Sequence, residues 1–167
     1  MITLKPLSSE ALPAAQAKAE RYRLLNEPDQ AESICEDILA ADPGNHQATI
    51  TLLLALTDRF DRGDGHLVAR AQQLASQLHT PYERAYFAGL VAERRARALL
   101  EGGGPGRART AVHWLHEAMG HYEEAERLRI AGNDEATLRW NACARVLNAR
   151  PDLRLLEPDT TTPVTNE

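Results

Sequence analysis

The amino-acid sequence predicts an all-α protein built from stacked helical hairpins, and three observations support this prediction. Ala and Leu dominate the apolar residues and aromatic residues make up only 5% of the chain, a composition that favours helices packed through small side chains. No segment has the alternating pattern of a half-buried strand. The segment from Pro13 to Asn45 has the spacing of one complete helix–turn–helix unit. With 167 residues, the chain is long enough for one domain with a sizeable core.

Helix-stopping residues divide the first half of the chain into four expected helices. The first runs from about residue 9 or 11 to residue 25, and the second from residue 27 or 28 to residue 41. The segment 42–45, Asp-Pro-Gly-Asn, ends the second helix because proline cannot continue a helix and glycine and asparagine accept turn conformations. A third helix is expected at about 47–58 and a fourth at about 67–78, on either side of a loop with two glycines.

A strong start signal opens the second half. Thr80 suits a helix cap and Pro81 suits the first helical position, so together they predict a long helix that continues to Glu101. The glycine-rich segment 102–106 breaks this helix, and a sixth helix is expected at about 107–129. A phosphate-binding loop would need Lys and then Ser or Thr directly after its last glycine. Arg and Ala follow instead, so the segment is interpreted as a connector.

The end of the chain carries one more helix and a tail. Gly132–Asp134 provides a break and a cap residue before a seventh helix, expected at 135–148. The helical domain is therefore placed at residues 9–156, after an N-terminal extension at 1–8. The tail at 157–167 is rich in Thr and has no apolar pattern, which predicts disorder.

The unit at Pro13–Asn45 resembles the tetratricopeptide repeat, a helical hairpin of 34 residues. Counted from Leu12, its small, aromatic and proline positions fall in step with that family. The second unit, at about 46–79, has a longer turn, and the third is interrupted by the glycine loop. The resemblance implies about three hairpins, with the seventh helix as a cap over the last apolar face. The residues at the landmark positions of the first unit are Ala19, Tyr22, Ala31 and Pro43.

The resemblance also implies a function: a non-catalytic interaction module or adaptor that binds a peptide or a partner helix in a concave groove. It implies no cofactor, and an incompletely capped end would allow homo-oligomers. Arg94 and Arg97 either grip a carboxylate or belong to a solvated helix face. The groove positions carried onto this sequence are Gln16, Glu20, Arg23, Leu24, Ile50, Leu54, Thr57, Glu83, Tyr86, Leu90, Glu93, Arg94 and Arg97.

Members of that family that bind the acidic tails of chaperones use Lys and Asn at fixed groove positions. The corresponding positions here supply almost none of the required hydrogen-bond donors, so this particular use is not expected. These positions hold Gln16, Glu20, Thr51, Glu83 and Phe87.

Charge and hydropathy argue against nucleic acid and membrane partners. The net charge is −5, and the small basic clusters at Arg94–Arg97 and Arg107–Arg109 are interpreted as solvated helix faces. The longest apolar run, Leu52–Leu56, is far shorter than the ~20 residues that span a bilayer. No signal-peptide stretch is present at the N-terminus. Cys35 and Cys143 have no metal or redox spacing, so buried thiols and a cytoplasmic location are expected.

An alternative function centres on the sixth helix. His113, Glu117 and His121 fall within one arc of a helical wheel, on the face opposite the apolar residues. Two histidines and a carboxylate could hold zinc or nickel, or perform acid–base chemistry in a metal-dependent or acid–base enzyme. A solvated or partner-facing surface is the preferred interpretation. The segment Gly120–Ala125 also resembles a repeat turn, and a turn there would separate the three side chains.

Overall fold

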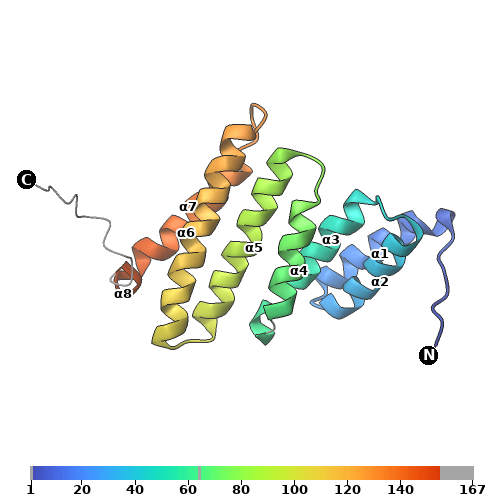
Figure 1. Cartoon of the computed structure of the whole chain (residues 1–167), viewed down its shortest axis with the longest axis horizontal. Coiled ribbons are helices and arrows are strands. Elements are labelled where there is room, and N and C mark those ends of the chain that lie inside the picture. The colour runs from blue at the N-terminus through green and yellow to red at the C-terminus, as the bar shows by residue number, and fades with distance from the viewer. Residues whose placement is uncertain (1, 64, 155–167) are drawn as a thin grey trace, which may run out of the picture.

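The computed structural model describes residues 2–63 and 65–154, and over these ranges the chain forms a row of packed helices with no strand (Figure 1). This confirms the predicted all-α class. The helices fall within a few residues of their expected positions. The α-helices are α1 (Leu12–Leu24), α2 (Pro28–Ala41), α3 (His46–Thr57), α4 (Gly65–Ser76), α5 (Pro81–Glu101), α6 (Pro105–Leu128), α7 (Glu135–Ala149) and α8 (Pro151–Arg154), and the 3-10 helices are η1 (Ser9–Ala11) and η2 (Phe60–Arg62).

The helices form three consecutive hairpins and a cap. Helices α1 and α2, α3 and α4, and α5 and α6 pack as pairs, and each pair also contacts the next helix in the chain. Helix α7 packs on α6 and is followed by the short α8, which together close the C-terminal end of the row (Figure 1). The odd-numbered helices also contact one another in order, so α1, α3, α5 and α7 share one side of the stack.

Local capping explains where two of the central helices begin. The Thr80 hydroxyl accepts a 3.1 Å hydrogen bond from the Glu83 backbone N–H, and the Glu83 carboxylate accepts a 3.0 Å bond from the Thr80 backbone N–H. This reciprocal capping box fixes the start of α5. Asn45 caps α3 by a single side-chain bond, because its side-chain oxygen accepts a 2.9 Å hydrogen bond from the Ala48 backbone N–H.

Two hydrophobic clusters hold the stack together. One is built mainly from α3 and α4 with residues from α1, α2, η2 and α5, and the other from α5, α6 and α7 with Leu153 of α8. Trp114 on α6 packs against both clusters and so joins them. In the second cluster, Tyr122 is fully buried and lies against Gly89 of α5. Because Gly89 has no side chain, α5 and α6 approach closely there.

Several details differ from the expectations or lie beyond the described residues. Helix α6 continues without interruption through Gly120, so the alternative of a turn at Gly120–Ala125 is wrong. The expected loop after α3 contains the short helix η2. The extension at 2–8 has no regular secondary structure. The boundary expected at 156 and the tail at 157–167 fall outside the part of the chain that the structure describes.

Within the described ranges, no helix combines the length and the apolar character that crossing a membrane requires. Both cysteines are buried free thiols, as expected. Burial raises the pKa of the Cys35 thiol to about 12, and neighbouring glutamates add to this effect. Burial likewise raises the pKa of the Cys143 thiol to about 12, with the negative charge of Glu93 as the next cause.

Candidate binding groove

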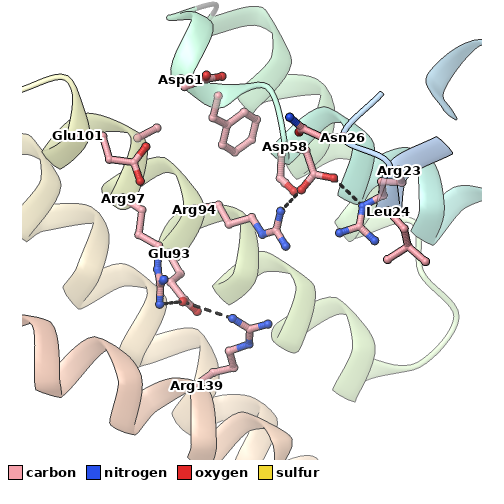
Figure 2. A pocket seen from close by; sticks show the side chains of 13 residues that line it. Arg23, Leu24, Asn26, Asp58, Asp61, Glu93, Arg94, Arg97, Glu101 and Arg139 are labelled. Carbon is pink, nitrogen blue, oxygen red and sulfur yellow. Dashed lines mark hydrogen bonds and ion pairs between the residues drawn. The ribbon is translucent and has the colours of Figure 1, made fainter. Parts of the chain in front are cut away.

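A hollow of about 580 Å³ crosses the side of the stack that the odd-numbered helices share. Charged side chains from α1, α5 and α7 and from the segment after α3 surround this hollow, the groove (Figure 2). Four arginines and four carboxylate residues are among its lining residues. The groove is lined by Arg23, Leu24, Asn26, Thr57, Asp58, Phe60, Asp61, Glu93, Arg94, Arg97, Ala98, Glu101 and Arg139.

Asp58 joins three helices at one side of the groove. It is the C-terminal cap residue of α3, so its side chain leaves the helix just where α1 and α5 pass. Its Oδ2 lies 2.6 Å from Arg23 Nε, and its Oδ1 contacts Nη1 of Arg94 (Figure 2). All three side chains are only about a quarter exposed or less, with values of 19%, 23% and 26%. Partial burial lowers solvent screening, so these ion pairs hold α1, α3 and α5 in register.

Glu93 forms the centre of a second set of contacts. It is a buried carboxylate, with 1% of its surface exposed. Its Oε1 lies 2.7 Å from Arg97 Nη2 and 3.4 Å from Arg139 Nη1, while Oε2 accepts a 2.7 Å hydrogen bond from the Tyr122 hydroxyl. A buried carboxylate needs such partners, because an unpaired buried charge is costly. The contacts therefore connect α5, α6 and α7 at the wall of the groove.

Glu93 and its buried surroundings influence the protonation of its two partners Tyr122 and Arg139. Burial raises the pKa of the Tyr122 hydroxyl far above its ordinary range, and the negative charge of Glu93 raises it further. Burial by itself lowers the pKa of Arg139, but the charge of Glu93 and a hydrogen bond with Tyr86 outweigh it, so the net shift is upward. Tyr122 therefore stays protonated and Arg139 stays charged at physiological pH.

Nine of the thirteen expected groove residues lie in two parts of the same side of the stack. Six of them line the groove itself: Arg23, Leu24, Thr57, Glu93, Arg94 and Arg97. Three others make polar contacts between odd-numbered helices beyond it. Gln16 donates a 2.9 Å hydrogen bond to the Thr51 hydroxyl, Glu20 accepts a 3.2 Å bond from Gln47, and Glu83 lies 2.8 Å from His46 Nε2.

The remaining four expected residues do not line the groove either. Ile50, Leu54 and Tyr86 are half-buried, and Tyr86 packs against the rings of Phe87 and Tyr122. Leu90 is buried, with 3% of its surface exposed, so its side chain is not on the surface. Helix α5 lies between α4 and α6, and a helix with neighbours on both sides has fewer exposed positions than an end helix.

Sequence reasoning missed several charged residues of the groove. Asp58 and Asp61 follow the end of α3, in a segment interpreted only as a helix end and a loop. Arg139 was missed because α7 was treated only as a cap. A signal for Asp58 was present, since it is the first charged residue after the apolar run of α3. A carboxylate just past an apolar helix has to find partners on the neighbouring elements.

The histidine face of α6 lies apart from the groove. His113 Nε2 is 3.9 Å from Glu117 Oε2, and their side chains are 72% and 44% exposed. His121 is also exposed. Among the residues that the structure describes, no group of three or more His, Cys, Asp or Glu side chains is arranged to hold a metal ion. The geometry thus adds no support to the alternative of a metal or acid–base site at His113, Glu117 and His121.

Comparison of the chain with protein-family models, with curated proteins and with solved structures gives no match.

Proposed function

We propose that this protein is a non-catalytic interaction module, an adaptor of the tetratricopeptide type, that binds a segment of a partner protein in the groove. One observation carries the proposal. A single hollow is formed jointly by all three hairpins and the capping helix, and its charged side chains come from elements far apart in the sequence. Such a composite surface is suited to an extended or helical segment that contacts several helices at once.

The ion pairs of the groove support a binding role because they hold its charged side chains in place before a partner arrives. Asp58 positions Arg23 and Arg94, and Glu93 positions Arg97 and Arg139. Recognition groups that are already ordered lose less conformational entropy on binding. Beside them, Leu24 is 84% exposed and offers an apolar contact at the edge of the groove.

The proposal includes a cytoplasmic location and a protein or peptide partner, and a second copy of the chain is the alternative partner for an exposed end of the stack. The location is supported by the two cysteines, which are both buried and unpaired. Unpaired thiols are typical of reducing compartments.

Site-specific photo-crosslinking tests the function. A photoreactive phenylalanine analogue replaces Leu24 in the groove, and a matched control carries it at Gln72, an exposed residue of α4. Both proteins are irradiated in extracts of the native host, and the adducts are identified by mass spectrometry. We expect a dominant adduct from the Leu24 position that Gln72 does not give.

A charge reversal then ties that adduct to the groove. Arg94→Glu should abolish it, whereas Arg70→Glu should retain it, because Arg70 is ion-paired with Glu32 and Glu36 on α2, away from the groove. Identical adducts from Leu24 and Gln72, or an adduct that survives Arg94→Glu, would contradict binding in the groove.

A further inference from the structure

The groove contains more positive than negative charge at its centre. Asp58 is shared by Arg23 and Arg94, so this set of three side chains carries one positive charge in excess. Glu93 is shared in the same manner by Arg97 and Arg139, which adds a second. A chain whose net charge is −5 thus presents a local positive site on the shared side of the odd-numbered helices.

The four arginines also have hydrogen-bond donors beyond those pairs. Each of the ion pairs described above uses a single guanidinium nitrogen: Nε of Arg23, Nη1 of Arg94, Nη2 of Arg97 and Nη1 of Arg139. A guanidinium carries five N–H donors on three nitrogens and accepts no hydrogen bond. An incoming carboxylate could therefore be bound without breaking the ion pairs to Asp58 and Glu93, and planar guanidinium groups match its geometry.

The remaining two acidic residues of the groove lie at its rim. Asp61 and Glu101 are exposed, and Figure 2 shows them in the upper part of the view, apart from Arg23 and Arg139. Counted over the whole lining, four arginines and four carboxylate residues balance, so the excess of positive charge is confined to the centre. The groove is therefore polarised, with arginines at the centre and carboxylates at one end.

We propose that the groove recognises an acidic segment of a partner protein, with a Glu or Asp side chain over the four arginines and an apolar side chain against Leu24. Charge complementarity favours the acidic residue, and the exposed leucine favours an apolar neighbour. This inference rests on the proposed binding function and specifies the chemistry of its partner.

Three labelled helical peptides of equal length test the inference by fluorescence anisotropy. They are built from Glu and Leu, from Gln and Leu, and from Lys and Leu. We expect the Glu–Leu peptide to bind on the order of tenfold tighter than the Gln–Leu peptide at low salt, and the Lys–Leu peptide to bind most weakly. The advantage of the Glu–Leu peptide should shrink as salt screens the charges. Equal binding of the Glu–Leu and Gln–Leu peptides would overturn the inference.

Matched variants locate the effect. Arg94→Gln should remove most of the preference for the Glu–Leu peptide, whereas Arg70→Gln should retain it, since the two arginines are similarly exposed, at 26% and 29%, and both are paired with carboxylates. Arg97→Gln is a second groove variant, in which Glu93 keeps Tyr122 and Arg139 as partners. Asp61→Asn combined with Glu101→Gln should strengthen binding of the Glu–Leu peptide. Loss of the preference in Arg70→Gln, or its retention in both Arg94→Gln and Arg97→Gln, would overturn the inference.

Two comparisons distinguish recognition of an acidic protein segment from general anion attraction and from the proposed binding function. A single-stranded oligothymidylate of the same charge serves as a competitor, and displacement of the Glu–Leu peptide at equal concentration would show general anion attraction and overturn the assignment to a protein segment. If the Leu24 crosslink identifies a partner but the Glu–Leu peptide has no advantage, the acidic specificity fails while the binding function stands. If neither is observed, both fail.

Discussion

The hydroxyl of Tyr122 donates a 2.7 Å hydrogen bond to the carboxylate of Glu93, and both side chains are buried between α5 and the helices that follow it. Tyr122 belongs to the hydrophobic cluster of the third hairpin, whereas Glu93 pairs with Arg97 and Arg139 in the lining of the groove. The pair therefore links the packing of the core to the position of the charges that we propose to bind a partner.

Removing the hydroxyl of Tyr122 should destabilise the fold. In Tyr122→Phe, Glu93 loses a hydrogen-bond donor in a buried place, and we expect the free energy of unfolding to fall by about 1–3 kcal/mol. Urea denaturation followed by circular dichroism measures this. Tyr22→Phe is the control, because Tyr22 is half-buried on α1 and its loss of a hydroxyl should cost under about 0.5 kcal/mol. Equal effects of the two changes would contradict a special role for the Tyr122–Glu93 bond.

A methyl group at Gly89 should disrupt the contact between α5 and α6. The Cβ of an alanine there would lie 2.7 Å from Cε1 of Tyr122, closer than real contacts allow. We expect Gly89→Ala to lower the free energy of unfolding by about 1–3 kcal/mol, as overpacked core sites do. Gly120→Ala should instead raise it by about 0.5–1 kcal/mol, because Gly120 lies inside α6 with open space around it. Thermal unfolding of both variants checks this, and a stabilised Gly89→Ala would contradict the packing described.

Both thiols should be unreactive in the folded protein. Burial raises the pKa of Cys35 and that of Cys143 to about 12, so at pH 8 almost no thiolate is present, and solvent does not reach either sulfur. A disulfide reagent such as Ellman's reagent should detect no thiol in native protein and two thiols per chain in guanidinium chloride. Rapid reaction of either cysteine under native conditions would contradict this.

The capping box of α5 should weaken in acid. Burial tends to raise the pKa of Glu83, but hydrogen bonds from the Thr80 backbone and from His46 outweigh it and hold this pKa below its ordinary value of 4.5. A carboxylate with a lowered pKa stabilises the fold above the unfolded-state value, and this contribution is lost as the pH falls through the folded-state value. As the pH is lowered from 7 to below 4.5, the free energy of unfolding should therefore fall less steeply for Glu83→Gln than for the unsubstituted protein. Parallel curves would show that Glu83 contributes nothing to the acid sensitivity.

Much of the fold was predictable because helix boundaries are set by nearby residues. Thr80 and Asn45 cap the helices that follow them, and prolines at first helical positions and glycine-rich breaks mark most of the others. These signals act over three or four residues, so they can be interpreted along the chain without knowledge of the packing. The uninterrupted course of α6 through Gly120 was harder to predict, since its burial against α5 and α7 is a tertiary effect.

The sequence by itself determined an all-α chain of hairpins, their order and the helix faces that become buried, because spacing and capping are local properties. Only the tertiary structure decided which charged residues meet. Asp58 lies 35 residues after Arg23 and 36 residues before Arg94, and Arg139 lies 46 residues after its partner Glu93. Such pairs depend on how the odd-numbered helices stack, and stacking is fixed by the packing of two separate cores. The groove is therefore a property of the assembled hairpins, and no single hairpin contains it.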